Sequence, residues 1–310
     1  MNEQAELIVI LGPTATGKTR VAALLAKELG SCVISADSRQ VYKYMDIGTG
    51  KDIQDYNVNG FQVPYYMTDI AEPGTRYNLF EYQRDFHKVF AQVVRNGTIP
   101  VMCGGSGLYI DCIVRNYDLR EVPQNPELRK DLKKKSLAEL KTILAGYIRL
   151  HNDTDVDTVN RAVRAIEIAV YQHEHRLTSP PYRNIPSLVF GIESDRDERR
   201  ERITKRLLKR VDEGLIEEVE GLLNRGVTHD DLIFYGLEYK YVSEYLRGIL
   251  QKDAFIRQLE TAIHQFAKRQ MTFFRSMERK GVVIHWLPRS LSNEEIVSGM
   301  LQKITEVSAG

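Results

Sequence analysis

Short runs of apolar residues recur along the chain, and each gives way to a glycine loop or to polar residues. The runs cover residues 7–11 (LIVIL), 32–35 (CVIS), 99–103 (IPVMC), 188–192 (LVFGI) and 282–287 (VVIHWL). Segments with helical periodicity lie between them, such as the one in which Val21, Leu24 and Leu25 share a face. Continuous apolar strands that alternate with helices are typical of a parallel sheet covered on both faces. The pattern therefore predicts an α/β fold.

Residues 118–186 show a different pattern, with helical periodicity and no strand signal. This stretch holds PQNPELRKDLKKKSLAELKTIL and DVDTVNRAVRAIEIAVYQ, which are both typical of helices. We interpret it as a helical insertion between two strands of the sheet. The core then consists of residues 1–117 and 187–310, with a second helical block from residue 197 to about residue 250.

The stretch from Phe255 to Lys280 predicts one long helix with two faces. The apolar face, which we expect to pack inward, consists of Ile256, Leu259, Ile263, Phe266, Phe273 and Met277. A second and mostly basic stripe consists of His264, Lys268, Thr272, Arg275 and Arg279. Such stripes are usually solvated, but this one has no acidic partner before Glu278. A solvated face and an anion-binding face are both open interpretations.

Composition narrows the class of protein. The chain has 310 residues, of which 43% are apolar and 27% charged, as expected for a soluble globular protein. Its net charge is +1, so any contact with nucleic acid must come from local basic clusters. Cys32, Cys103 and Cys112 form no CxxC pair, which predicts buried free thiols in a reducing cytosol. No apolar run approaches the roughly 20 residues of a membrane span. We expect a cytoplasmic monomer without a membrane segment.

A glycine-rich loop between the first apolar run and the first helical segment matches the phosphate-binding pattern GxxxxGK[ST]. It consists of Gly12, Pro13, Thr14, Ala15, Thr16, Gly17, Lys18 and Thr19. Its glycines let backbone N–H groups converge on phosphate oxygens, and the following helix adds the partial positive charge of its N-terminus. We expect Lys18 to reach the terminal phosphate and the Thr19 hydroxyl to ligate Mg²⁺. The motif predicts a P-loop NTPase-like sheet that binds a pyrophosphate or a nucleotide, and it does not by itself specify ATP.

Asp37 follows the second apolar run, and ligands of open α/β sheets bind at the carboxyl ends of the strands. A carboxylate at this place could bind Mg²⁺ through water or accept a proton from an attacking nucleophile. It could equally cap a turn, because Asp-Ser is common in turns and at helix starts. The residues alone leave these roles open.

Three segments together resemble the bacterial tRNA dimethylallyltransferase family, namely GPTATGKT at 12–19, SADSRQVYKYMDIGTGK at 35–51 and GGSGLYI at 104–110. Further similarity lies in NRAVRAIEI at 160–168, DEGLIEEV at 212–219 and QFAKRQMTFFR at 265–275. The resemblance implies transfer of a dimethylallyl group from dimethylallyl pyrophosphate. Its acceptor would be N6 of the adenosine at tRNA position 37, beside the anticodon.

The resemblance also implies the catalytic residues, which are Asp37, Ser106, Lys18 and Arg206. Asp37 matches the family's catalytic aspartate and would accept a proton from the adenine N6 amine. Ser106 stands where the family usually has threonine, and it keeps the hydroxyl. Lys18 and Arg206 would neutralise charge on the leaving pyrophosphate. Without the resemblance, nothing singles out Arg206 among the arginines and lysines of residues 196–210.

The same resemblance implies contacts with the anticodon stem-loop of tRNA. The matching residues are Asp37, Ser38, Arg39, Gln40, Asn160, Arg161, Arg164, Lys240, Lys268, Arg269 and Gln270. Arg161 and Arg164 lie three residues apart on one helix face, which suits phosphate contact. The target adenosine would have to leave the anticodon stack for its N6 to reach the prenyl carbon.

The chain departs from the family pattern in the part expected to face RNA. Tyr235 and Glu238 stand where the family has arginine and glycine. His264, Ile263 and Phe273 replace arginine, threonine and tryptophan. The phosphate site is therefore intact, while the details of anticodon-loop recognition differ.

Three alternatives compete with prenyl transfer to tRNA. Prenylation of free AMP, ADP or ATP would use the same loop and aspartate, but it needs neither the insertion nor the AKRQ helix. A P-loop kinase or ATP-driven switch would turn over ATP without a prenyl donor. A non-catalytic tRNA-binding protein would bind tRNA and transfer nothing.

Overall fold

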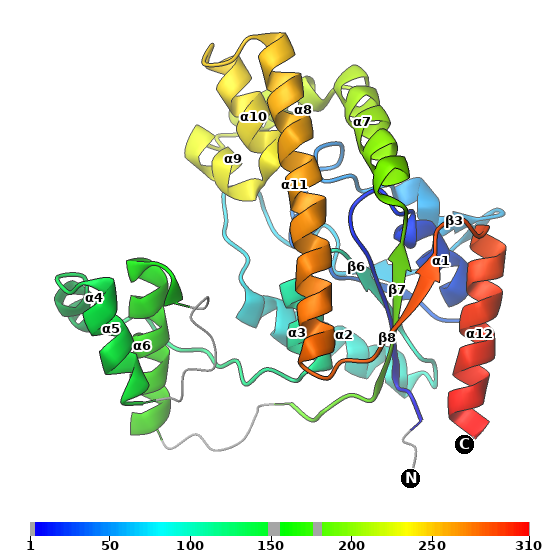
Figure 1. Cartoon of the computed structure of the whole chain (residues 1–310), viewed down its shortest axis with the longest axis horizontal. Helices are drawn as coiled ribbons and strands as arrows, with labels where there is room; N and C mark the ends of the chain where they lie inside the picture. The colour runs from blue at the N-terminus through cyan, green and yellow to red at the C-terminus, as the bar shows by residue number, and fades with distance from the viewer. Residues whose placement is uncertain (1–3, 148–155, 176–181, 310) are drawn as a thin grey trace. The chain divides into compact units, whose positions relative to one another are not determined.

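The computed structural model describes residues 4–147, 156–175 and 182–309, which form two compact units (Figure 1). The smaller unit is Asp118–Tyr182, and the larger one holds the residues before and after it. Of the insertion expected at 118–186, residues 148–155 and 176–181 lie outside the described residues. Residues 183–186 join the larger unit, and a strand begins at Ser187.

The larger unit is built on a parallel sheet whose described strands run in the order β5-β2-β6-β1-β7-β8. These strands are β1 (Leu7–Leu11), β2 (Val33–Ser35), β5 (Tyr65–Tyr66), β6 (Val101–Gly104), β7 (Ser187–Glu193) and β8 (Ile284–Pro288). All five residues of β1 are buried, because the strand lies between β6 and β7 and both of its faces are covered. The predicted α/β fold with a central parallel sheet is confirmed.

Three short strands were not predicted. One is β5 at the sheet edge, and the others are β3 (Asn57–Val58) and β4 (Phe61–Gln62), which form an antiparallel pair. Each has only two residues, and no apolar run marks any of them.

Helices cover the sheet from two sides (Figure 1). On one side α1 (Lys18–Glu28) and α12 (Asn293–Ala309) share an apolar core with β1, to which Val21 and Met300 contribute. On the other side lie α2 (Leu79–Arg95), α3 (Gly107–Val114) and the long α11 (Lys252–Arg279). The α2 helix begins with a capping box between Asn78 and Glu81, which satisfies two of its free N–H groups.

A helical layer follows β7, the fourth of the predicted strands, and packs on the first half of α11. It comprises α7 (Arg196–Asp212), α8 (Leu215–Asn224), α9 (His229–Tyr235) and α10 (Leu237–Leu246). These helices share one apolar cluster with α11 and with buried residues of the 41–45 segment. Gly214, with φ 105°, separates α7 from α8 in a conformation that favours glycine. The short turn η1 (Ile53–Tyr56) lies against α1.

The smaller unit contains α4 (Pro126–Leu132), α5 (Leu137–Ala145) and α6 (Val159–Glu174) around its own apolar cluster. Val163 and Ile166 of α6 are buried in that cluster, as the helical pattern predicts. Burial opposes ionisation of Glu167, but hydrogen bonds from Arg129, the Asn125 backbone and Arg164 outweigh it and hold its pKa at about 2. A charged network thus orders this unit.

The sequence composition led to two expectations, one about the cysteines and one about membrane-spanning helices. All three cysteines are buried and free, as predicted. None of the helices in the described parts of the chain combines the length and apolar character needed to cross a bilayer.

Candidate active site

The phosphate loop lies between β1 and α1, as its motif predicts. Ala15 and Gly17 adopt left-handed φ values of 64° and 72°, which turn the loop back toward the helix start. Gly12 has no room for a side chain, because a Cβ there would lie 2.7 Å from the Ile192 carbonyl oxygen of β7. The buried Thr16 hydroxyl donates to the Pro13 carbonyl at 3.0 Å. Sheet packing and local hydrogen bonds thus preform the loop.

Gln270 of α11 bridges two loops of the sheet edge. Its Oε1 accepts a hydrogen bond from Thr14 N, and its Nε2 donates to the Gly105 carbonyl oxygen, both at 2.9 Å. The side chain is buried, and its amide already has two protein partners. Sequence reasoning gave Gln270 only a contact with tRNA and missed this bridge, because the two loops lie 256 and 165 residues before Gln270.

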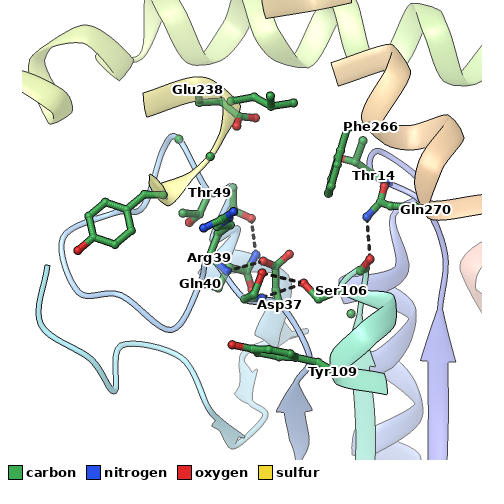
Figure 2. A pocket seen from close by; sticks show the side chains of 18 of the residues that line it. Thr14, Asp37, Arg39, Gln40, Thr49, Ser106, Tyr109, Glu238, Phe266 and Gln270 are labelled. Atoms are coloured by element: carbon green, nitrogen blue, oxygen red, sulfur yellow. Dashed lines mark hydrogen bonds between the residues drawn. The ribbon is translucent and has the colours of Figure 1, made fainter. Parts of the chain in front are cut away.

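Asp37 and Ser106 meet at the centre of the site (Figure 2). Ala36 N donates to the Cys103 carbonyl at 2.7 Å, and Ser106 N donates to the Ala36 carbonyl at 3.1 Å. The Ser106 hydroxyl oxygen accepts a hydrogen bond from Ser38 N at 2.9 Å. One carboxylate oxygen of Asp37 accepts from Arg39 N at 2.9 Å, so the turn-capping role is real. The second oxygen has no hydrogen bond among the described residues.

A cavity of about 760 Å³ joins these groups, a size typical of small-molecule sites. Lys18, Thr19, Asp37, Ser106 and Arg206 all line it. Burial lowers the pKa of Lys18, and the nearby Asp37 carboxylate partly offsets this effect. Lysine, carboxylate and loop N–H groups therefore face one space, although sequence positions 18, 37, 106 and 206 are far apart.

Arg206 reaches the cavity from α7. It forms an ion pair with Asp52 and donates to the Gly50 carbonyl oxygen at 3.4 Å. Arg210, one helical turn later, and Glu238 at the start of α10 line the same wall. The sequence reasoning did not assign Arg210 to the site, although its i, i+4 spacing from Arg206 places the two on one helix face.

Aromatic side chains form an apolar part of the cavity wall. Tyr109 stacks on the buried Tyr82 with ring centroids 3.9 Å apart, and Phe273 packs against Gly107. The prediction that Phe266 packs into the core is wrong. The residue is 40% exposed and lines the cavity with Phe273, because the cavity borders that face of α11. The cavity thus combines charged and apolar lining residues.

The residues expected to touch tRNA divide between the two units. Ser38, Arg39, Gln40, Lys240 and Arg269 line the cavity, and Lys268 is exposed on α11. Asn160, Arg161 and Arg164 belong to the smaller unit. There Asn160 and Arg161 are exposed, and Arg161 pairs with Asp157 at 2.9 Å. The Arg164 guanidinium is held by Glu167 and by the Val122 carbonyl oxygen.

Two positions that depart from the family pattern have structural partners. Tyr235 is buried, and its hydroxyl accepts from Gly74 N at 2.6 Å and donates to the Thr75 carbonyl at 2.8 Å. His264 lies 3.5 Å from Glu260, so the statement that the basic stripe lacks an acidic partner before Glu278 is wrong. Glu260 lies one turn earlier on the same helix.

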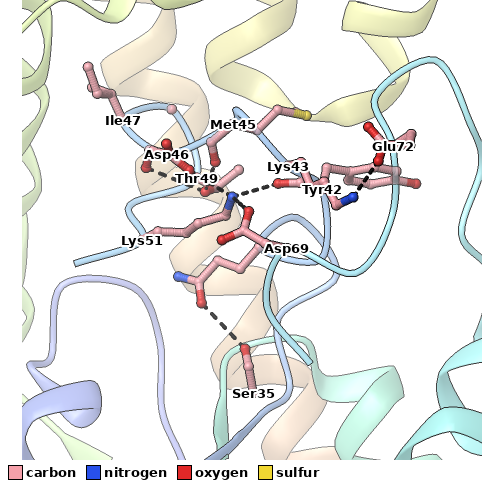
Figure 3. Close-up of polar contacts among 12 residues, drawn as sticks. Ser35, Tyr42, Lys43, Met45, Asp46, Ile47, Thr49, Lys51, Asp69 and Glu72 are labelled. Atoms are coloured by element: carbon pink, nitrogen blue, oxygen red, sulfur yellow. Dashed lines mark hydrogen bonds and ion pairs between the residues drawn. The ribbon is translucent and has the colours of Figure 1, made fainter. Parts of the chain in front are cut away.

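A buried lysine holds the segment that follows Asp37 (Figure 3). The Lys51 side chain is fully buried, and its amino group contacts Asp46 at 2.8 Å, the Tyr42 carbonyl oxygen at 2.6 Å, and Asp69. It closes the loop between Tyr42 and Lys51 and joins it to the neighbouring segment at Asp69. Because Gln40 Nε2 donates to the Gly50 carbonyl oxygen at 3.0 Å, this loop also positions a residue of the cavity.

Replacing Lys51 with methionine should lower the free energy of unfolding by about 2–3 kcal/mol. Breaking a buried pair costs roughly 3–5 kcal/mol, and the cost is smaller here because both carboxylates keep access to water. Lys43→Met is the matched control, since Lys43 pairs with Glu72 on the surface, and such exposed pairs contribute little to stability. Urea denaturation measures both variants, and equal losses would contradict a special role for Lys51.

Strand order, preformed loop and cavity define a P-loop protein whose site can hold a phosphate group beside an apolar one. Comparisons with known proteins give the family. Residues 40–277 match the sequence model of the family described as IPP transferase. The chain is 55% identical over 293 residues to tRNA dimethylallyltransferase 1 of Parabacteroides distasonis, covering 94% of this chain and 95% of that one. It is 54% identical over 301 residues to tRNA dimethylallyltransferase 2 of Bacteroides fragilis, covering 97% and 98%.

A solved structure agrees with these relatives. The tRNA isopentenylpyrophosphate transferase of Bacillus halodurans has a TM-score of 0.69 and 28% identity, over 99% of both chains. The chain belongs to the IPP transferase family, and the resemblance to bacterial tRNA dimethylallyltransferases is confirmed.

Proposed function

We propose that this protein transfers a dimethylallyl group from dimethylallyl pyrophosphate to N6 of the adenosine at tRNA position 37. The observation that carries the proposal is the shared cavity, in which the Asp37 carboxylate faces the same space as the phosphate loop, Lys18 and Arg206. A phosphate-binding loop alone would suit a kinase equally. The apolar wall that includes Tyr109 and Phe273 adds a surface suited to a prenyl chain.

In the proposed reaction the N6 amine attacks C1 of the prenyl group, and the C1–O bond to pyrophosphate breaks. Asp37 accepts the proton that N6 loses, through the carboxylate oxygen that the turn leaves unbonded. The pyrophosphate leaves with the bonding electron pair. Lys18 and Arg206 neutralise the charge that grows on the leaving oxygen, and electrostatic stabilisation of this kind is often the largest catalytic contribution. The Ser106 hydroxyl accepts from Ser38 N and lines the cavity with Asp37, so it would hold the pyrophosphate close to the proton acceptor.

Magnesium fits the donor set of the cavity. The Thr19 hydroxyl lines the cavity beside the phosphate loop, and Mg²⁺ usually takes one or two protein ligands together with phosphate oxygens and water. The described residues contain no cluster of three His, Cys, Asp or Glu side chains that would form an all-protein cage. Bound at Thr19, the ion would screen pyrophosphate charge.

The anticodon stem-loop of tRNA is the proposed acceptor. Arg39, Lys240 and Arg269 give the cavity a basic rim, and Lys268 extends it along α11. Half-buried Arg39 and Lys240 and exposed Lys268 and Arg269 suit contact with a phosphate backbone. Arg161, exposed on α6, is the corresponding candidate in the smaller unit.

Labelled dimethylallyl pyrophosphate incubated with unmodified tRNA tests the proposal. We expect label in tRNA, located on the position-37 adenosine by nucleoside analysis. Parallel reactions with AMP, ADP or ATP as acceptor separate the alternatives, because transfer to free nucleotides alone would replace tRNA as the acceptor. ATP hydrolysis without prenyl donor would indicate a kinase or switch, and tight tRNA binding without transfer would indicate a non-catalytic binder.

A further inference from the structure

Arg210 is a cavity-lining arginine that the reaction described above does not use. Its side chain is only 12% exposed, and its nearest charged partner is Glu238, with Nη1 and Oε1 3.5 Å apart. Glu238 is itself 19% exposed and lines the same cavity. Within the described parts of the chain, the Arg210 guanidinium makes no hydrogen bond, although a guanidinium carries five N–H donors.

The guanidinium groups of Arg210 and Arg206 lie side by side. A Cβ built on Gly50 would overlap the Nη2 atoms of both, so both groups cover the same point of the 48–51 loop. Burial lowers the pKa of Arg210, and the charge of Arg206 lowers it further. A largely buried cation such as Arg210 beside a second cation is unfavourable unless anions compensate the two charges. The protein supplies one carboxylate to each, Asp52 to Arg206 and Glu238 to Arg210.

We propose that Arg210 is a second guanidinium ligand for the pyrophosphate of the donor, and that Glu238 competes with the pyrophosphate for it. The inference rests on the proposed function, because it takes the prenyl pyrophosphate as the ligand. Planar guanidinium groups bind phosphate oxygens in pairs of hydrogen bonds, which would satisfy donors that Glu238 leaves free. Arg206 and Arg210, spaced by one helical turn, would then contact the pyrophosphate from one side. The phosphate loop would contact it from the other side.

This role differs from two simpler ones in measurable ways. If the Arg210–Glu238 pair only fastened α7 to α10, removing either charge would change the affinity for each substrate in the same direction. If Arg210 faced the acceptor, its loss would change the KM for tRNA. If Glu238 competes with the pyrophosphate, loss of the Arg210 charge should weaken pyrophosphate binding and loss of the Glu238 charge should strengthen it, because removing Glu238 frees Arg210 for the pyrophosphate.

The test uses full-length Arg210→Met and Glu238→Gln, with Lys209→Met as the control. Lys209 is the neighbouring residue on α7, but it is 70% exposed and pairs with Glu213. Calorimetric titration with inorganic pyrophosphate, which needs no turnover, gives the affinity, and steady-state kinetics give separate KM values for donor and tRNA.

We expect Arg210→Met to weaken pyrophosphate binding and raise the donor KM about tenfold, the loss of one charge-assisted contact. Glu238→Gln should strengthen pyrophosphate binding roughly threefold, since it removes the competing charge. Lys209→Met should change neither.

Weakening of pyrophosphate binding in both variants would overturn the proposal in favour of a structural pair, as would an unchanged affinity in both. A change confined to the tRNA KM would assign Arg210 to the acceptor instead. Should Arg210→Met fail to fold, the sign of the change in Glu238→Gln decides alone. A wild-type protein that binds pyrophosphate but transfers no prenyl group would refute the proposed function and leave the affinity test of Arg210 intact.

Discussion

Asparagine at position 37 should reduce the turnover number of prenyl transfer by about 10²–10⁴-fold, the range typical of a lost general base. Donor affinity should stay nearly unchanged. Asparagine keeps the side-chain oxygen that accepts from Arg39 N, so the turn after β2 survives while the proton acceptor is lost. Single-turnover kinetics at saturating donor and tRNA measure the chemical step, and calorimetry with pyrophosphate measures donor-site binding.

Asp55→Asn is the control for this variant. Asp55 lies on η1 and does not line the cavity. It is also partly buried, and burial raises its pKa, so it matches Asp37 as a carboxylate but lies outside the reacting groups. Its replacement should leave turnover within about twofold, as for residues outside the reacting centre. If Asp37→Asn instead lost donor affinity and kept full turnover at saturation, Asp37 would belong to donor binding and not to proton transfer.

Methionine at position 18 should lower turnover by about 10²–10³-fold, the loss expected when one group that stabilises developing charge is removed. It should also weaken pyrophosphate binding, because Lys18 is the cation that the phosphate loop itself carries. Lys27→Met, on the last turn of the same helix, is the matched control and should retain activity. A Lys18→Met protein that folds, as judged by thermal melting, and transfers at the wild-type rate would disprove the role.

The lowered pKa of Lys18 adds a pH dependence to this prediction. Lys18 attracts an anion only while it is protonated, and burial places its pKa below the usual lysine range. Pyrophosphate affinity in the wild type should therefore be highest below that pKa and fall as the pH rises through it. Binding of the anion raises the pKa, so it should be accompanied by proton uptake in this range. Lys18→Met should lack this component of the pH profile.

Patterns local in sequence predicted much of this molecule. Buried parallel strands are continuous apolar runs, so the five longer strands were recognisable, whereas the two residues of β5 carry no such signal. The spacing of the phosphate loop located Lys18 and Thr19 together with the strand and helix that hold them. Because Asp37 follows a predicted strand, its place at the carboxyl edge of the sheet was predicted correctly.

Contacts that depend on how helices pack were out of reach. Helical periodicity gives the face on which Phe266 lies, but not the fact that a cavity meets that face. The pairing of Arg210 with Glu238 depends on how α7 and α10 meet, and the two Gln270 hydrogen bonds depend on where α11 crosses the sheet edge. The family resemblance identified Arg206 as a candidate site residue, whereas the charge pattern of α7 alone does not distinguish it from the neighbouring arginines and lysines.

The approach of Gly104 to Ala36 has a consequence for how this site can be altered. A Cβ at Gly104 would overlap the Ala36 backbone, so the loops that carry Asp37 and Ser106 are joined main chain to main chain. The spacing of the reacting groups is therefore fixed by atoms that every residue type possesses. Exposed side chains that line the cavity, such as Phe234 and Arg269, can be exchanged without changing that spacing. Acceptor preference is thus open to redesign separately from the chemistry, by substitutions that leave these two loops untouched.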